Sequence, residues 1–290
     1  MHPAPSVILF TTLSGLGFGY LVFLATGAVA LSGWAAFFAW GLGYGLAVAG
    51  LMASTFHLGN PQRALKAFTQ WRSSWLSREA WTSCAALFAL APMALSDWLD
   101  LGLPRPIGWA GAVLALATVG CTAMIYTQLK TVPRWNHWTT PASFFAFALA
   151  GGAVLAGQGW LASGLCLSLG LALVLQFRLG DHQFAARGET MGSATGLGGI
   201  GPVRVFEQPH TGPNYLMREM IHVVGRRHAR KLRLIALLCA ALVPAVLCAL
   251  LPPMVAAVTA GALHLTGALA ARWLFFAEAE HVVGLYYGMR

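Results

Sequence analysis

The stretch VILFTTLSGLGFGYLVFLATGAVAL, residues 7–31, decides the fold of this chain, and WAAFFAWGLGYGLAVAGLMASTFHL, residues 34–58, repeats its character. Neither stretch contains Asp, Glu, Lys or Arg, and all of 1–62 is free of these residue types. A helix needs roughly 20 mostly apolar residues to span the hydrocarbon core of a bilayer. Each stretch is therefore long enough for one transmembrane helix, and Ser32 and Gly33 form the break between them.

The same pattern continues along the rest of the chain. Further runs without charged residues cover 80–96, 106–129, 135–177 and 234–271. Gly157 and Gly159 divide the third of these runs, and Pro252-Pro253 divides the last. The sequence thus predicts eight transmembrane helices, near 7–31, 34–58, 78–98, 107–130, 140–157, 160–179, 233–251 and 254–276.

Composition supports this class of protein. Hydrophobic residues make up 58% of the 290 residues and charged residues 9%, with a mean hydropathy of +0.67. A soluble domain carries roughly 25% charged residues. We therefore expect an all-α integral membrane protein, in which residues 1–290 form a single eight-helix bundle with one long polar loop. The first residues lack a basic segment, so a cleaved signal peptide is not expected.

Charged residues are concentrated on one predicted side of the bundle, which we call the near face. It carries both termini and the connections 59–77, 131–139 and 180–232. Of the 18 Lys and Arg residues, only Arg105 maps to the opposite, far face. The positive-inside rule places the near face and both termini in the cytoplasm of a bacterium, with the chain in the inner membrane. A basic face also suits an acidic partner protein, and both explanations can hold together.

Tryptophans support the layout, because amphipathic rings settle at both headgroup levels. They fall at the two predicted boundaries: Trp71, Trp75, Trp81, Trp135 and Trp138 on the near side, and Trp34, Trp98, Trp109 and Trp160 on the far side. The sequence pI of about 9.8 arises from basic residues beside hydrophobic spans. This distribution suits the anionic headgroups of a lipid bilayer and excludes nucleic acid as a partner.

Segment 180–232 is too long for a simple connector and too polar to enter the bilayer. We expect it to be an extramembrane loop on which a partner docks. Its GxGxxG at 196–201 lacks a preceding strand and is followed by Pro202, so it does not indicate nucleotide binding. The pattern of 215–233 favours an amphipathic helix. Two interpretations stay open for it: a helix lying on the membrane surface, or a docking surface for a soluble subunit.

We expect the protein to hold no redox centre or metal of its own. Its five cysteines all fall inside predicted spans without CxxC spacing, which gives no sign of disulfides, zinc or an iron–sulfur cluster. His264 lies in the middle of the last span, but no other histidine falls at a similar depth. A bis-histidine haem is therefore not expected, and His264 is predicted to hydrogen bond within the bundle.

Two ionisable residues fall at the near membrane boundary on consecutive spans. His57 ends the second span, and Glu79 is predicted in the first turn of the third, after Ser77 as N-cap. Taken singly, each is explained by the helix dipole. Together they form a pair of proton acceptors beside aromatic rings, which a two-electron, two-proton carrier such as quinol requires. We therefore predict that His57 accepts or relays a proton and that Glu79 assists.

The turn between these residues supplies further candidates. Asn60 and Pro61 predict the start of a short interfacial helix that carries basic residues. Quinol is expected to bind between the second and third spans, where Arg63 and Arg72 tune the pKa values of the acceptor pair. Trp75 is expected to pack against the quinol ring.

Several segments of the chain resemble the membrane anchor subunit of DMSO reductase, the DmsC family. The most specific are TFHLGNPQRA at 55–64 and RSSWLSRE at 72–79. LKTVPRWN at 129–136, ATGLG at 194–198 and PHTGPNYL at 209–216 also look like family signatures. The similarity extends over most of the length of the chain.

The resemblance implies an eight-helix, haem-free anchor for a molybdopterin catalytic subunit and an iron–sulfur subunit. Such an anchor exchanges electrons with the quinone pool, menaquinol or ubiquinone. It is itself a non-catalytic or quinol-oxidising subunit. The menaquinol-linked His and Glu of the family fall on His57 and Glu79. DMSO reductase-type quinol oxidation is the leading expectation. Anchors of membrane-bound sulfite dehydrogenases are similar, and there electrons run into quinone.

Two other classes of function stay open from the residues alone. A secondary transporter would place polar sites or broken helices at mid-bilayer, often in inverted repeats. The predicted spans instead contain mostly Gly with a few Ser and Thr, and no convincing repeat relates the two halves. In a purely structural anchor, His57 and Glu79 would only cap helices.

Overall fold

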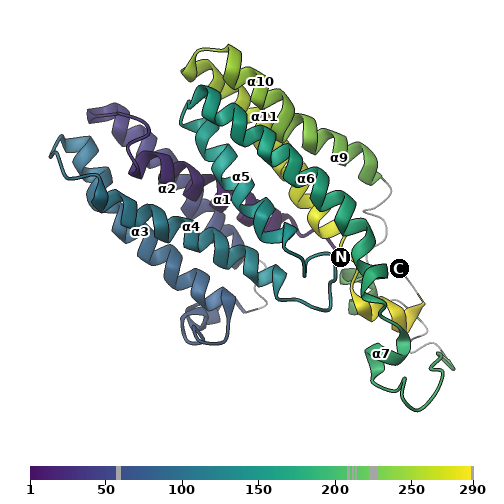
Figure 1. The fold of residues 1–290 in the computed structure, drawn as a ribbon. Helices are drawn as coiled ribbons and strands as arrows, with labels where there is room; N and C mark the ends of the chain where they lie inside the picture. Colours follow the sequence, from purple (N-terminus) through teal and green to yellow (C-terminus); the bar gives the residue numbers. More distant parts are fainter. Residues whose placement is uncertain (57–59, 208–209, 211, 213, 222–227, 289–290) are drawn as a thin grey trace.

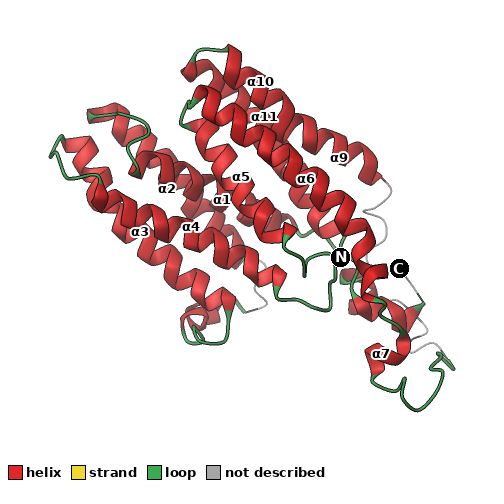
Figure 2. Cartoon of the chain, in the orientation of Figure 1, coloured by secondary structure: helices red, strands yellow, loops and turns green. Residues whose placement is uncertain are grey.

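The protein is described by a computed structural model that covers residues 1–56, 60–207, 210, 212, 214–221 and 228–288; within this part helices are joined by loops and turns, and there is no strand (Figure 2). The helices in chain order are α1 (Pro5–Ala25), α2 (Gly33–Thr55), η1 (Pro61–Phe68), α3 (Trp75–Leu99), α4 (Pro106–Thr127), α5 (Thr139–Leu155), α6 (Gly159–Arg187), α7 (Met191–Thr195), α8 (Tyr215–Glu219), α9 (Ala229–Leu237), η3 (Leu238–Leu242), α10 (Val243–Leu250), α11 (Pro253–Ala277) and η4 (Val282–Tyr287).

The long helices form one bundle around α1 (Figure 1). Helix α1 packs against α2, α4, α5 and α11, while α3 packs outside α4. Helix α6 packs on α5 and α10, and α11 packs against α9, η3 and α10. Consecutive long helices run in opposite directions, as expected where short connections join neighbouring helices.

Glycine allows the close approach of helices around α1. A Cβ atom added to Gly19 would lie 1.8 Å from the carbonyl oxygen of Ala148 in α5. A Cβ on Gly17 would lie 2.3 Å from the backbone nitrogen of Ala47 in α2. In lipid, helices associate through such small-residue contacts because the lipid tails are as apolar as the side chains. The Gly content of the first two spans thus serves packing.

Seven helices of the described residues are long and apolar enough to cross a membrane: α1, α2, α3, α4, α6, the continuous run Ala229–Leu250 and α11. The remaining expected span, α5, is an apolar helix of 17 residues, Thr139–Leu155, and is shorter than the others. The all-helical membrane fold is confirmed. The predicted count of eight spans is not confirmed, because only seven helices of the described residues reach a spanning length and α5 does not.

Two helix ends differ from the prediction by six residues or more. Helix α1 ends at Ala25 instead of residue 31, because Gly27 turns the chain with φ of +77°. Helix α6 continues to Arg187 instead of ending at 179, and Gly188 closes it in the left-handed conformation with φ of +62°. Hydropathy marks where a span leaves the apolar layer, whereas the backbone stays helical until a residue such as Gly188 ends it. The long loop on the near face consequently begins at 188.

The described part of this loop contains only short helices. Helix α7 follows Thr190, whose side chain accepts a hydrogen bond from the backbone nitrogen of Ser193 at 3.2 Å. Helix α8 covers Tyr215–Glu219 of the predicted amphipathic segment, and residues 222–227 of that segment lie outside the described residues. No strand precedes the GxGxxG at 196–201, which lies in a turn, as expected.

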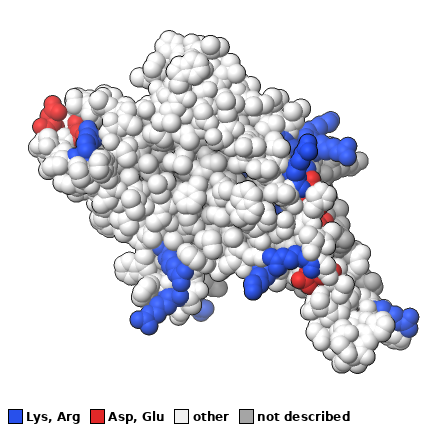
Figure 3. Space-filling view, in the orientation of Figure 1, with Lys and Arg blue, Asp and Glu red and all other residues white. Residues whose placement is uncertain are grey.

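Both termini lie at the same end of the bundle, beside α7 and the long loop (Figure 1). The backbone nitrogen of His2 donates to Glu219 in α8 at 2.7 Å, and that of Val282 donates to Thr131 at 3.0 Å. Charged atoms gather at the two ends of the bundle, and a broad band without them lies between (Figure 3). Arg105 lies at the far end, where it pairs with Asp97 at 2.9 Å.

Four charged side chains join the near ends of helices on the α6 and α11 side of the bundle. Glu278, just after α11, lies 2.6 Å from both Arg134 and Arg233. Asp181 of α6 lies 2.9 Å from Arg134 and 2.5 Å from Arg233. We call these four residues the near-face ion cluster. It links α6, α9, the end of α11 and the connection before α5.

His264 of α11 hydrogen bonds within the bundle, as predicted. Its Nδ1 atom lies 2.8 Å from the carbonyl oxygen of Ala240, and its side chain is buried. Ala240 belongs to η3, a π-helical segment, and Pro244 follows four residues later without an N–H to donate. The imidazole therefore supplies the hydrogen bond that Pro244 denies to this carbonyl.

Candidate functional site

Glu79 does not lie in the first turn of its helix. Helix α3 begins at Trp75, after Ser74 in extended backbone, so Glu79 is its fifth residue and Ser77 is helical. The predicted N-cap role of Ser77 is therefore wrong, because the helix starts at Trp75, three residues before the expected start at 78. Since the helix dipole acts mainly on the first turn, capping no longer explains a carboxyl group at this position.

The Glu79 side chain points into the bundle, where it is 4% exposed. Its Oε1 atom accepts a short hydrogen bond from the hydroxyl of Thr122 in α4. The same hydroxyl lies 3.0 Å from the carbonyl oxygen of Thr118, one turn earlier in α4. A hydroxyl has one hydrogen and two lone pairs. Thr122 can thus donate to an ionised Glu79, or accept from a protonated Glu79 and donate to Thr118.

Trp75, Arg78 and Trp81 form the outer surface beside Glu79. The Arg78 guanidinium lies 4.3 Å from the centroid of the Trp75 ring and donates to the carbonyl oxygens of Trp71 at 2.9 Å and Arg72 at 2.7 Å. The indole nitrogen of Trp81 donates to Phe68 of η1 at 3.0 Å. These contacts fix the turn between α2 and α3 against α3.

An open apolar cleft of about 400 Å³ lies on this surface, lined by Trp71, Arg78, Trp81 and Thr82. Its size falls in the range of sites for small organic ligands. The Thr82 hydroxyl lies 3.2 Å from the backbone carbonyl oxygen of Glu79. The Glu79 carboxyl group itself points to a neighbouring face of α3, toward Thr122. The cleft and the buried acid therefore lie on adjacent faces of one helix.

The structure brings together only part of the predicted site. Helix α2 ends and α3 begins at the same end of the bundle, but His57 lies outside the described residues. Arg63 in η1 is exposed, and Arg72 is exposed with its guanidinium 5.5 Å from the Trp71 ring centroid. Trp75 is half-buried under Arg78. Within the described residues, neither Arg63 nor Arg72 hydrogen bonds or pairs with Glu79.

Sequence reasoning missed four residues of this region. Arg78, Trp81 and Thr82 flank Glu79 along the chain, and helical spacing places Arg78 and Thr82 on one face. That spacing was a usable signal. Thr122 lies 43 residues away on another helix. Nothing in the sequence alone pairs it with Glu79.

A further missed residue is Arg272, a buried arginine within the predicted last span. An ionisable residue inside a span is a functional candidate by default. Arg272 lies close to the near end of α11, where a long side chain is readily interpreted as reaching for the surface. Burial of its side chain among α1, α4 and α5 is a fact of the tertiary structure.

The helices, the apolar band and the charged ends together define a multi-pass membrane protein. The family model of the DMSO reductase anchor subunit (DmsC) matches residues 1–163. The C subunit of sulfite dehydrogenase from Allochromatium vinosum is 33% identical over 326 aligned positions, which cover 99% of this protein and 99% of that one. The protein therefore belongs to the DMSO reductase anchor subunit (DmsC) family, as the sequence motifs predicted.

A second relative matches a shorter part of the sequence. The C chain of the anaerobic dimethyl sulfoxide reductase from Escherichia coli is 29% identical over 118 residues, 37% of this protein and 38% of that one. No solved structure gives a significant match. Membership of a family of anchor subunits favours the anchor over the secondary transporter among the functions considered from the sequence.

Proposed function

We propose that this protein is the quinone-interacting membrane anchor of a molybdopterin oxidoreductase complex, exchanging electrons between the quinone pool and an iron–sulfur subunit. The observation that carries the proposal is Glu79, a carboxyl group buried at the near end of α3 in a member of the anchor family. Burying an acid in a membrane bundle is costly, so such residues are retained for function.

The residues around Glu79 suit quinone chemistry. Quinone and quinol interconvert with two electrons and two protons, so their site needs a proton donor or acceptor within reach. Trp71 and Trp81 offer aromatic faces in an open cleft that an apolar, ring-bearing molecule can enter from lipid. Glu79 lies on the face of α3 next to this cleft, where it can hold or release a proton. Thr122 can hydrogen bond to it in both the ionised and the protonated state. His57, at the end of the second span, remains the second proton-accepting group of this proposal.

The partner subunit docks, we propose, on the loop 188–228 at the near face. Phe206 is 96% exposed there and Ile200 86% exposed. Beside them an apolar groove of about 520 Å³ is formed by residues of the loop and of η4: Met191, Thr195, Val203, Arg204, Val205, Phe206, Glu207, Leu216, Val283, Tyr286 and Tyr287. Exposed aromatic side chains rimmed by polar groups are typical of protein interfaces. The groove therefore offers the iron–sulfur subunit a surface outside the bilayer.

The substrate of the complex is, we propose, sulfite, with electrons running into quinone. The relative named for sulfite dehydrogenase matches this protein over its whole length, whereas the DMSO reductase relative matches little more than a third. Oxidation of sulfite with water to sulfate releases two electrons and two protons, and reduction of quinone to quinol consumes two of each. In this direction Glu79 donates a proton to the reduced quinone.

An assay of the purified complex tests this direction. Sulfite is expected to drive reduction of a soluble quinone analogue, whereas DMSO with a reduced quinol analogue is expected to give no turnover above background. Absorbance of the quinone ring follows both reactions. Turnover with DMSO and quinol alone would assign the complex to the reductase direction. Turnover with neither would overturn the assignment of sulfite as the substrate.

The near face lies, we propose, in the cytoplasm, with the protein in the bacterial inner membrane. All Lys and Arg residues except Arg105 map to the near face, and both termini lie there as well. By the positive-inside rule, this distribution supports a cytoplasmic near face. A fluorescent protein fused after residue 290 is expected to fluoresce, and alkaline phosphatase fused at the same place to stay inactive. The reverse pair of results would place the near face outside the cytoplasm.

A further inference from the structure

Arg272 on α11 is a buried cation in a membrane-spanning helix, with 3% of its surface exposed. Arginine keeps its charge under all ordinary conditions, so burial requires compensation by charge or hydrogen bonds. Within the part of the chain that the structure describes, no carboxylate lies within 4.0 Å of it. Groups other than carboxylates must therefore compensate the buried charge of Arg272.

Aromatic rings provide part of the compensation. The guanidinium carbon lies 3.6 Å from the centroid of the Phe144 ring and 5.0 Å from that of Phe147. Such cation–π contacts attract the charge. They do not replace the hydrogen-bond acceptors that the five N–H groups of arginine require.

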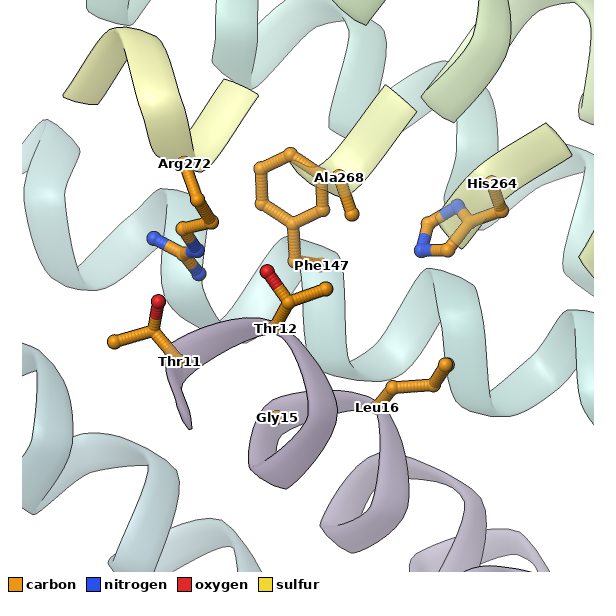
Figure 4. A pocket seen from close by; sticks show the side chains of 8 residues that line it. All are labelled: Thr11, Thr12, Gly15, Leu16, Phe147, His264, Ala268 and Arg272. Carbon is orange, nitrogen blue, oxygen red and sulfur yellow. The ribbon is translucent and has the colours of Figure 1, made fainter. Parts of the chain in front are cut away.

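Two small cavities beside Arg272 supply polar surroundings. Each has a volume of about 10 Å³, at the lower limit for one water molecule. Thr11, Gly15 and Arg272 line both cavities. The hydroxyls of Thr11 and Thr12 point toward the guanidinium side of the first cavity (Figure 4). Thr12 is buried, and its hydroxyl has no hydrogen-bond partner among the described residues, which indicates a water position.

The second cavity connects Arg272 with the candidate site. Thr122, the hydrogen-bond partner of Glu79, lines this cavity together with Ser14 and Arg272. A water there can donate to the hydroxyl of Thr122 and accept from the guanidinium. The acid and the cation therefore share one polar region inside an apolar bundle.

We propose that water in the second cavity joins Arg272 to Thr122, and that Arg272 is a positioning residue whose charge favours the ionised form of Glu79. The inference rests on the proposed function and deepens it, because it assigns control of the proton on Glu79 to a residue outside the quinone cleft. A buried cation lowers the free energy of a nearby anion more than it would in water, since screening is weak.

Other charged and titratable groups near Glu79 act differently. Cys121 and Tyr126 are buried residues of the neighbouring helix α4, and neither carries a positive charge. On α3, Arg78 is directed away, toward Trp75 and the backbone of the preceding turn. The polar side chains that helix α1 contributes to the two cavities are uncharged hydroxyls, those of Thr11, Thr12 and Ser14. His57, which follows α2, lies outside the described residues. Arg272 is thus the buried cation on the described elements around this region.

Infrared titration of the full-length protein in lipid nanodiscs tests the inference. The band of the Glu79 carboxyl group is identified by subtracting the spectrum of Glu79→Gln, and its intensity is followed against pH. In Arg272→Gln, Glu79 is expected to hold its proton up to a pH about one unit higher than in the wild type, a roughly tenfold change in proton affinity. Arg272→Lys, which keeps the charge, is expected to restore most of the difference.

Arg105→Gln is the matched control, because it removes an arginine from the far end of the bundle and should leave the titration of Glu79 unchanged. Circular dichroism shows whether each variant is folded. A Glu79 titration that does not move in a folded Arg272→Gln overturns the inference. An equal displacement in Arg272→Lys overturns it as well, because charge is then not the cause. Neither result would contradict the proposed function. That function is tested separately by measuring quinone turnover in Glu79→Gln.

Discussion

Glu79→Gln is expected to lower quinone-linked turnover of the complex by about 100-fold or more, with assembly of the subunits unchanged. General acid–base groups contribute typically 10²–10⁴-fold to a rate, and glutamine cannot carry the proton. Glutamine has the volume of glutamate, and its amide oxygen can still accept the hydrogen bond of Thr122. The effect should therefore fall on proton exchange and not on packing.

Two measurements separate chemistry from assembly. Reduction of a quinone analogue reports the function of this protein, while reduction of a soluble dye that accepts electrons directly from the iron–sulfur subunit reports the partner subunits. Only the first is expected to fall in Glu79→Gln.

Asp100→Asn is the matched control, since Asp100 is exposed at the far end of α3 and has a φ of +58°, which asparagine tolerates. Unchanged quinone reduction in Glu79→Gln would show that Glu79 is structural.

Glu278→Ala is expected to destabilise the protein by about 3–5 kcal/mol, the range for breaking a buried ion pair by removing one partner. The Glu278 side chain is 5% exposed and contacts both Arg134 and Arg233 at 2.6 Å. Without it, Arg134, which is 12% exposed, keeps its ion pair with the more exposed Asp181. Loss of the cluster should loosen the near ends of α6, α9 and α11 from one another.

Thermal unfolding of the full-length protein in detergent, followed by circular dichroism, measures this effect. Asp181→Ala is the matched comparison: its side chain is 42% exposed, so water screens its pairs and a loss of about 0–1 kcal/mol is expected. Equal stability of Glu278→Ala and the wild type would mean that the near-face ion cluster does not hold the helices together.

The near-face ion cluster also explains the difference between predicted and observed α6. Asp181 and Arg187 lie beyond the apolar run, so hydropathy ended the span at 179. In the structure Asp181 is fixed by Arg134 and Arg233, which come from segments 47 and 52 residues away along the chain. Contacts over such separations leave no local pattern in a sequence, so hydropathy alone did not place Asp181 within the helix.

In the candidate site, too, some features were predictable from the sequence and others depend on contacts between distant segments. Glu79 was recognisable as a candidate because an acid between long apolar runs is conspicuous, and the motifs around it carried the resemblance to the anchor family. The sequence did not indicate in which direction the Glu79 side chain points. The helix starts at Trp75 and not at residue 78, so Glu79 is no longer a first-turn residue, and its side chain is a buried partner of Thr122. Arg63 and Arg72 were expected beside it, and the described structure leaves both at the surface.

The sequence by itself determined the membrane-embedded, all-helical nature of this protein, the two unequal faces and the family. These properties follow from local hydropathy and charge, because each span must satisfy its own backbone hydrogen bonds and exclude charge wherever it sits. Only the tertiary structure decided which polar groups meet inside the bundle: Glu79 with Thr122, Arg272 with two small cavities, and His264 with the carbonyl freed by Pro244. These contacts join residues of different helices, so they depend on how the helices pack and cannot be deduced from any one helix alone.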